Sequence, residues 1–333
     1  MNRNPLVSLI TPGWNGKDFI HNLLDSILNQ TYQNLEYIYI DDGSSDGTKD
    51  IVLSYKEKFK ERGIKFLYIY KQNGGVSSAI NEGLKYVKGE YLCWPEYDDI
   101  LLPESVELKV KYLEEHPDCA VVTSDAWLVN IDNINKKQGV LSYHNPNRFD
   151  RNHFVQSLLT NSIFTAACHM IRMSMFDAVN PTREIYPSPI GPNWQMLLPL
   201  YYKYNRGFIE KPLLYYVIRP DSISHSNNTL EQKIASIDEY IRILKYILDQ
   251  VIMMPESDRK LYHRLIDEKY AIDRMELGIQ FHDGDLFYKW YKYCKENNIS
   301  PALVNDLKKQ FECRIYYTFI KFLKRITKRL IIK

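Results

Sequence analysis

Blocks of apolar and polar residues alternate along the first part of the chain and predict alternating strands and helices. Short apolar runs rich in β-branched residues predict strands, and apolar residues three or four positions apart predict helices. The predicted strands cover residues 5–11, 35–40, 64–70 and 90–94, and the predicted helices between them cover residues 18–30, 48–59 and 77–87. Strands joined by single helices imply right-handed crossovers, so the pattern predicts an α/β fold with a mostly parallel sheet flanked by helices.

A polar cluster follows each of these four predicted strands. The clusters are Trp14 with Asn15, Asp41 with Asp42, residues 73–75 (NGG) and residues 96–99 (EYDD). Ligands of parallel α/β sheets bind outside the carboxyl ends of the strands. Four polar clusters at one edge of a sheet therefore favour a binding site over four solvated loops.

The last cluster carries carboxylates on Glu96, Asp98 and Asp99, directly after an apolar segment. Carboxylate oxygens suit Mg²⁺ or Mn²⁺, which typically bind a couple of carboxylates and complete their shell with phosphate oxygens and water. An ion held in this way can bridge a diphosphate and neutralise it as a leaving group. Taken alone, such a run is also typical of a solvated acidic turn, and the other three clusters are what favour a metal site.

Four segments resemble the successive motifs of family-two glycosyltransferases, which have the GT-A fold. They are residues 11–15 (TPGWN), 41–48 (DDGSSDGT), 73–81 (NGGVSSAIN) and 96–99 (EYDD). The resemblance is strong over residues 5–130, weaker to 226 and absent beyond. It implies a metal-dependent, inverting hexosyltransferase that moves a sugar from a UDP-sugar to an acceptor hydroxyl in surface polysaccharide or glycoconjugate assembly. A Rossmann dehydrogenase is a poor alternative, because no Gly-x-Gly-x-x-Gly follows the first strand.

The resemblance assigns a set of residues to the nucleotide sugar. Trp14 stands where the family places an aromatic ring against the nucleobase, and Asp42 matches the carboxylate that accepts the uracil N3–H. Gly75 has no Cβ and lets the backbone approach the nucleotide. The full set is Pro12, Trp14, Asn15, Asp42, Asn73, Gly75, Glu96, Tyr97 and Arg219.

Asp98 matches the metal-binding Asp of the family, which implies Mn²⁺ or Mg²⁺ as cofactor. Asp99 is either a further ligand or the cap of a helix near Pro103. In residues 215–225 (YYVIRPDSISH), Arg219 occupies the position of a family His that approaches the metal or diphosphate, and Arg can contact two phosphate oxygens at once. His225 is a second candidate for the metal, and Arg219 alternatively lies at the surface before a turn.

The acceptor side is predicted in the middle of the chain, where residues 131–162 suggest a long loop beside the cleft. Residues 191–198 (GPNWQMLL) depart from the family, which has a catalytic Asp where Asn193 stands. An amide cannot act as a general base, so either Asp125, on a predicted strand over 120–130, takes the acceptor proton or the base lies elsewhere. Asn193, Trp194 and Gln195 are predicted to face the acceptor, although Trp194 is equally suited to helix packing and Gln195 to facing water.

A missing base keeps a second function open, a nucleotide-sugar-binding scaffold or inactive homologue without transfer activity. The intact metal motif argues against it, because a decayed enzyme has no need to keep that motif. Transfer activity predicts two partners, a UDP-sugar donor and an acceptor that is a lipid-linked glycan or a glycoprotein.

For the 333 residues we expect two parts, a GT-A domain over residues 1–226, as the resemblance implies, and a helical C-terminal region over 227–333. Within the domain, residues 1–130 form the nucleotide-sugar half and residues 131–226 the acceptor half. Helices are predicted over 230–253, 256–281, 284–297 and 301–333. The last is basic and amphipathic, which suits the surface of an anionic membrane and is equally suited to packing within the region or on a second subunit of a homo-oligomer.

Net charge and cysteine content bear on the partners and the cellular location of the protein. A net charge of +2 gives no reason to propose nucleic acid as a partner. Five scattered cysteines without a Cys-x-x-Cys spacing fit reduced thiols in a cytoplasmic protein. No signal-peptide segment and no run of about 18 apolar residues is evident, so we expect a cytoplasmic location, at the inner face of the membrane if the last helix binds lipid.

Overall fold

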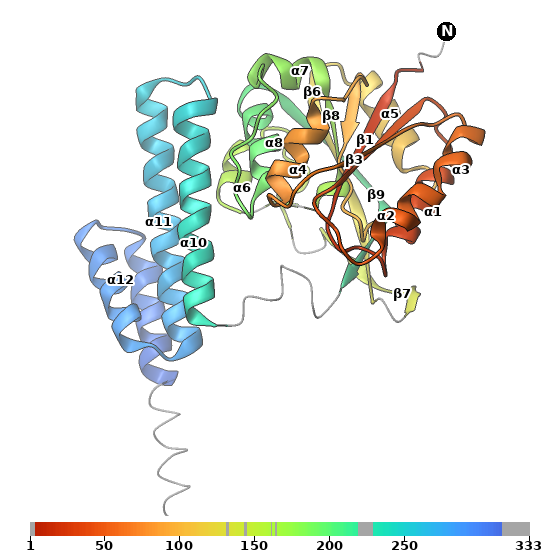
Figure 1. Cartoon of the computed structure of the whole chain (residues 1–333). Coiled ribbons are helices and arrows are strands. Elements are labelled where there is room, and N and C mark those ends of the chain that lie inside the picture. The colour runs from red at the N-terminus through yellow and green to blue at the C-terminus, as the bar shows by residue number, and fades with distance from the viewer. Residues whose placement is uncertain are drawn as a thin grey trace, which may run out of the picture. The chain divides into compact units, whose positions relative to one another are not determined.

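The computed structural model describes residues 4–130, 133–142, 145–160, 162–163, 165–218 and 229–314. These residues form two compact units (Figure 1). The first contains the described residues up to 218 together with Ile243–Met253, and the second contains residues 229–242 and 254–314. The division of function between a domain over 1–226 and a region over 227–333 stays a prediction.

The first unit is built on one nine-stranded mixed sheet with the strand order β3-β2-β1-β4-β8-β6-β9-β5, and β7 pairs with β6. The strands are β1 (Val7–Gly13), β2 (Leu35–Asp41), β3 (Lys65–Tyr70), β4 (Tyr91–Cys93), β5 (Ile100–Leu101), β6 (Cys119–Asn130), β7 (Asn133–Val140), β8 (His169–Arg172) and β9 (Asn205–Ile218). β1 pairs in parallel with both β2 and β4, and β2 pairs in parallel with β3. The four strands that precede the polar clusters therefore run in one direction and end at one edge of the sheet, as predicted.

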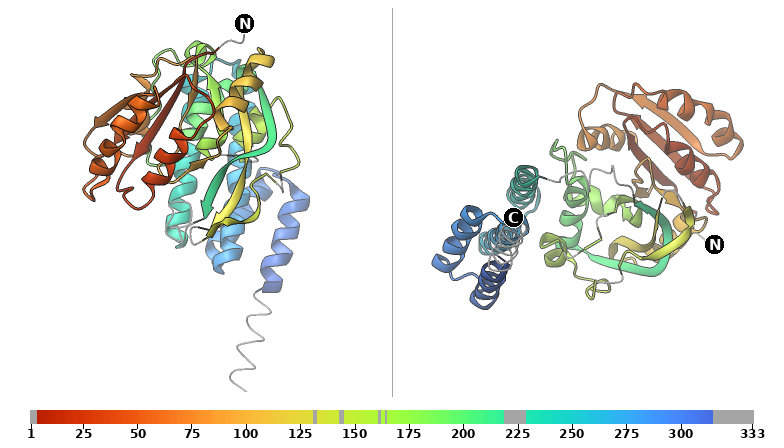
Figure 2. Two further views of the ribbon diagram at one scale, coloured as in Figure 1. Left: turned by 90° about the vertical axis from the view of Figure 1, so that its right-hand side faces the viewer. Right: turned by 90° about the horizontal axis from the view of Figure 1, so that it is seen from below.

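Helices cover both faces of this sheet (Figures 1 and 2). Those of the first unit are α1 (Ile20–Leu28), α2 (Thr48–Ser54), α3 (Lys56–Glu61), α4 (Val76–Leu84), α5 (Ser105–Glu115), α6 (Phe154–Leu158), the 3₁₀ turn η1 (Ala166–Cys168), α7 (Met173–Val179), α8 (Pro192–Lys203) and the π-helical turn η2 (Ile247–Val251). Every position of β1 and β2 is buried, as expected for parallel strands covered on both faces. The predicted α/β architecture is confirmed.

Three predicted elements differ in detail. The helix predicted over 48–59 is two helices, because Ser54 Oγ donates to the Ile51 carbonyl and the Tyr55 amide bonds to Val52, three residues back. The apolar run over residues 165–172 also predicts a strand, and this segment begins as η1 before it continues as β8. The predicted loop over 131–162 contains both β7 and the short helix α6. The sequence did not reveal β7, because this strand is largely exposed and polar and so lacks an alternation of apolar and polar residues.

The second unit is helical, as predicted. α11 (Glu256–Phe281) coincides with the predicted helix, α12 (Gly284–Glu296) ends one residue before its prediction, and residues 301–314 are helical. α10 (Leu230–Tyr246) ends where η2 begins. A small core packs Met275 with Phe287 and Phe311, whose rings stack at 4.2 Å between centroids. No helix within the described ranges is both long and apolar enough to cross a membrane.

Candidate functional site

The first two polar clusters are bound to each other at the edge of the sheet. The Asn15 amide donates to Ser44 Oγ at 3.0 Å, and Asn15 Oδ1 accepts from the Ser45 amide at 2.9 Å. Asp41, the last residue of β2, accepts from the Ser44 amide and from the Tyr68 hydroxyl. Asp41 therefore holds its own loop.

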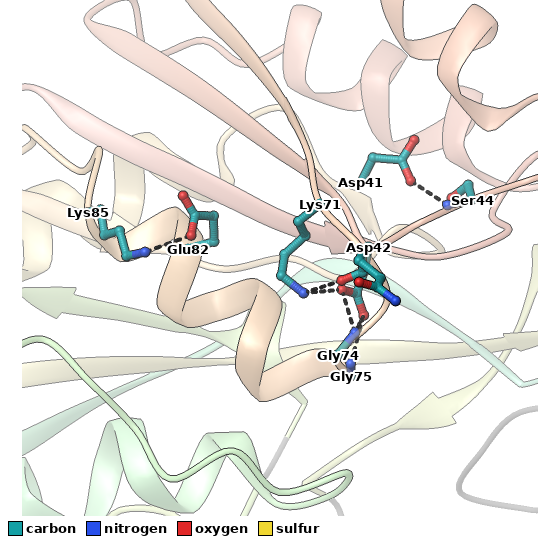
Figure 3. Close-up of polar contacts among 9 residues, drawn as sticks. Asp41, Asp42, Ser44, Lys71, Gly74, Gly75, Glu82 and Lys85 are labelled. Carbon is teal, nitrogen blue, oxygen red and sulfur yellow. Dashed lines mark hydrogen bonds and ion pairs between the residues drawn. The ribbon is translucent and has the colours of Figure 1, made fainter.

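Asp42 joins the second cluster to the third (Figure 3). Its Oδ1 lies 2.6 Å from Lys71 Nζ, and its two carboxylate oxygens accept from the Gly74 and Gly75 amides at 2.8–3.2 Å. Gly75 has a φ of 84°, a conformation that L side chains rarely adopt, so only glycine suits this turn. The loop after β3 is thus shaped around a nearly buried carboxylate, which is 3% exposed.

Trp14 is the most accessible residue of the first cluster. Its side chain is 54% exposed, although a tryptophan is usually among the most buried residues. Pro12 is buried inside β1, where it pairs with Ile40 of β2, so its side chain belongs to the sheet rather than to the surface. An exposed indole beside the Asp42 loop offers a flat apolar face to a planar ligand.

The acidic cluster leaves β4 as a tight turn. Asp99 is buried, its Oδ2 accepts from the Glu96 amide at 2.8 Å, and its own amide donates to the Glu96 carbonyl. Burial, followed by the charges of Glu96 and Asp98, raises the pKa of Asp99 well above its ordinary value. Asp99 is not a helix cap, because α5 begins after Glu104 with no side-chain cap; the prediction of capping was wrong, since the side chain closes its own turn instead.

The turn also contacts the first cluster. A Cβ added to Gly16 would lie 2.8 Å from the Tyr97 ring, so the loop after β1 and the acidic turn pack together through a residue without a side chain. Glu96 is exposed and Asp98 half-buried. Both carboxylates therefore lie in the same part of the sheet edge as the first loop.

These carboxylates fit a hard divalent ion that takes further ligands from a substrate. Within the described ranges, no three His, Cys, Asp or Glu side chains come together as a complete metal site. Mg²⁺ and Mn²⁺ bound to a nucleotide commonly use one or two carboxylates and phosphate oxygens, which matches the donor set of Glu96 and Asp98. The candidates Arg219 and His225 lie outside the described residues.

The first turn of α8 carries the three predicted acceptor residues, and each of these side chains bonds to a different part of the first unit. Asn193 Oδ1 accepts from the Trp94 indole N–H at 2.7 Å, and Trp194 donates its indole N–H to the Ser157 carbonyl of α6 at 3.1 Å. Gln195 bonds to both the amide and the carbonyl of Tyr186. Trp194 and Gln195 are 6% and 3% exposed, so their contacts are those of packing residues. Their acceptor role stays a prediction.

Asp125 lies in β6 and is buried, with 2% exposure. Its oxygens accept from the Ser142 amide at 3.0 Å and from Ser142 Oγ at 2.5 Å, which ties β6 to the chain after β7. These contacts describe an anchor, and its role as general base stays a prediction.

His169 of β8 is also fully buried. Its Nε2 lies 3.1 Å from the Ile163 carbonyl, which can only accept, so Nε2 carries the proton and Nδ1 accepts from Thr123. Burial lowers the pKa of His169 to about 3. A neutral imidazole with both nitrogens bonded inside the fold has no nitrogen left to take a proton from an acceptor.

Sequence reasoning missed two residues of this site. Lys71 directly follows β3, so the rule that ligands bind at strand ends could have identified it. Trp94 lies inside an apolar run, and its contact with Asn193, 99 positions away, left no local signal.

Comparison with known proteins identifies the family. The family model described as Glycosyl transferase family 2 matches residues 8–179, about half of the chain, and the chain therefore belongs to Glycosyl transferase family 2. An uncharacterized glycosyltransferase of Rickettsia typhi is 44% identical over 112 residues, which cover 34% of this chain and 33% of the relative. A putative teichuronic acid biosynthesis glycosyltransferase of Bacillus subtilis is 37% identical over 114 residues, covering 34% and 44%. The chain thus spans a third to less than half of the length of these curated relatives.

Solved structures support the GT-A fold. Staphylococcus aureus TarS, residues 1–349 in complex with UDP-GlcNAc, has a TM-score of 0.63 at 15% identity, covering 92% of this chain and 88% of that one. The mannosyltransferase PcManGT of Pyrobaculum calidifontis, in complex with GDP-Man and Mn²⁺, has a TM-score of 0.57 at 14% identity, covering 95% and 85%. At these identities the likeness shows the fold alone, and the predicted GT-A fold is confirmed.

Proposed function

We propose that this protein is a metal-dependent, inverting hexosyltransferase that moves a sugar from a UDP-sugar to an acceptor hydroxyl. One observation carries the proposal: parallel strands β1 to β4 end at one edge, where an exposed Trp14, the loop around Asp42 and the carboxylates of Glu96 and Asp98 follow them. An aromatic face, a hydrogen-bond acceptor and hard oxygen ligands are what a uracil ring and a metal-bound diphosphate require.

The nucleotide would lie across the first three loops. Trp14 stacks on uracil, and an oxygen of Asp42 accepts the uracil N3–H. The loop at Asn73 and Gly75 passes close to the nucleoside because its glycine turn carries no Cβ. TarS, which shares the fold, has been crystallised with UDP and with UDP-GlcNAc, and this supports a uridine donor here.

Asp98, with Glu96 beside it, would hold Mn²⁺ or Mg²⁺ against the diphosphate. The bound ion supplies charge neutralisation that makes UDP a better leaving group. Arg219 and His225 are proposed as further contacts to the diphosphate and the ion. Support for manganese comes from the shared fold of PcManGT, whose structure contains Mn²⁺ with GDP-Man.

Transfer requires an acceptor oxygen to bond to the anomeric carbon as the bond from that carbon to the diphosphate breaks. UDP leaves with the electron pair, and attack from the opposite face inverts the configuration. The acceptor proton must pass to a base within hydrogen-bond reach, directly or through one water. Asn193 cannot take it, and Asp125 is proposed only if Ser142 releases its carboxylate.

The biological setting is proposed from the relatives. The B. subtilis relative is named for teichuronic acid biosynthesis, which supports a role in surface polysaccharide or glycoconjugate assembly. The acceptor would then be a lipid-linked glycan or a glycoprotein, reached from the cytoplasmic face of the membrane. A nucleotide-sugar-binding scaffold is the second candidate function, and it is supported by the amide at position 193 and the bonded state of Asp125.

A donor panel tests the proposal. The protein is incubated with UDP-glucose, UDP-GlcNAc, UDP-galactose and UDP-GlcA, with Mn²⁺ or with EDTA, and UDP release is measured. Water is the acceptor in this assay, so Mn²⁺-dependent release of UDP together with the free sugar, formed first as the inverted anomer by NMR, supports transfer chemistry. Binding of a UDP-sugar without any release supports the scaffold, and no binding of UDP at all contradicts both.

A further inference from the structure

Trp94 is buried, directly follows β4 and lies two positions ahead of Glu96 in the acidic turn. Its indole N–H donates to Asn193 Oδ1 at 2.7 Å, so the end of β4 is bonded to the first turn of α8. Burying an indole N–H without a hydrogen-bond partner costs free energy, so the position of Asn193 Oδ1 fixes the position of the Trp94 ring.

Both partners are held by the surrounding fold. The indole stacks on His169 with ring centroids 6.0 Å apart, and that imidazole is itself bonded to Thr123 and Ile163. On the other side, the neighbours of Asn193 attach α8 to Ser157 and Tyr186. The Trp94–Asn193 bond is therefore a link between two immobilised elements rather than a contact between two mobile side chains.

We infer that Trp94 and Asn193 form a positioning pair that fixes the acidic turn, and with it Glu96 and Asp98, for metal-dependent binding of the UDP diphosphate. The inference rests on the proposed metal site. It also gives the amide at position 193 a role as a neutral hydrogen-bond acceptor. Neither residue is expected to touch the nucleotide.

The test uses UDP and Mn²⁺ alone, so it needs no knowledge of the donor sugar or acceptor. UDP affinity is measured by calorimetry with Mn²⁺ and with EDTA, and the ratio of the two affinities is the readout. We use Trp94→Phe, which keeps an aromatic ring and removes the donor, Asn193→Leu, which keeps the size and removes the acceptor, and the double variant. Tyr91→Phe is the matched control, because Tyr91 is a buried aromatic of β4, three positions before Trp94, and its hydroxyl bonds to Glu114 and Arg172 instead.

Trp94→Phe and Asn193→Leu are each expected to lower the affinity ratio about three- to tenfold, the range of one neutral hydrogen bond, and the double variant to lower it no further. UDP affinity in EDTA and the ratio for Tyr91→Phe should not change. A merely structural role would lower the melting temperature of all three single variants and leave the ratio of the folded protein intact.

The outcomes separate this inference from the proposed function. A parent protein whose UDP affinity does not depend on Mn²⁺ overturns the proposed metal site and the positioning pair together. A parent that responds to Mn²⁺, with variants that respond equally, overturns the positioning pair alone. Additive losses in the double variant also overturn it, because two residues that act through one bond cannot lose it twice.

Discussion

Lys71 Nζ lies 2.6 Å from Asp42 Oδ1, and Asp42 in turn accepts from the Gly74 and Gly75 amides. The Asp42 carboxylate, directly after β2, thus holds the loop after β3 in place. Asp42→Asn keeps the size and removes the charge. We expect UDP affinity to fall by about 10- to 100-fold, the range of a hydrogen bond to a charged group.

The nucleobase itself provides the control for Asp42. Cytosine has no N3–H, so an acceptor that reads N3–H must favour UDP over CDP in the parent and lose that preference in Asp42→Asn. Calorimetry with both nucleotides measures the preference. If Asp42→Asn weakens UDP and CDP equally, Asp42 only shapes the loop.

Trp14→Ala should weaken UDP binding by about 1–3 kcal/mol, the scale of a base stacked on an aromatic side chain. Tyr86→Ala is the matched control, because Tyr86 is also an exposed aromatic (39%) but follows the far end of α4 from Gly75. Fluorescence titration with UDP measures both. Equal affinity for UDP in Trp14→Ala and the parent would place the stacking surface elsewhere.

Asp98→Ala should abolish transfer and remove the Mn²⁺-dependent part of UDP binding while the protein stays folded. Glu115→Ala removes an exposed carboxylate at the end of α5 and should leave both properties unchanged. Calorimetry with Mn²⁺ and with EDTA measures the effect. A variant at position 98 that still binds UDP more tightly in Mn²⁺ refutes the assignment.

Asp125→Asn tests an anchor against a base. If Asp125 is an anchor bonded twice to Ser142, Asp125→Asn should lower the unfolding free energy of the protein by about 1.5–3 kcal/mol. Ser142→Ala should lower it by less, because the hydrogen bond from the Ser142 backbone amide remains. Urea denaturation measures both. A general base would instead show turnover lowered by about 10²- to 10⁴-fold at unchanged stability.

His169 should make the fold acid-sensitive. Its pKa of about 3 in the folded protein lies below the ordinary value of 6.5, so the unfolded state binds more protons between these values. Its contribution to stability is therefore complete above pH 6.5 and is lost as the pH falls toward 3, by up to about 1.4 kcal/mol per pH unit. His169→Gln should flatten the dependence of unfolding free energy on pH between 6.5 and 4. If the slope of unfolding free energy against pH does not change in this variant, other titrating groups are responsible for the acid sensitivity.

The repeating pattern of short apolar runs and amphipathic segments was enough to predict the order of strands and helices up to β4 and the edge at which polar residues gather. Such signals are local, because strand and helix periods are written in neighbouring residues. The same holds for α11, whose predicted ends coincide with the observed ones. The motifs at 41–48 and 96–99 were readable for the same reason, since each is a single continuous turn.

Contacts between distant segments were decided only by the tertiary structure. The sequence placed Asp125 on a strand but could not show that Ser142 would bond to its carboxylate, and it could not pair Trp94 with Asn193. The sequence likewise did not reveal β7, an exposed strand. Its polar residues do not indicate a strand, and β7 forms because its backbone pairs with β6. Periodicity records how one segment meets water and core, whereas the burial of a carboxylate or an indole depends on which remote segment packs over it.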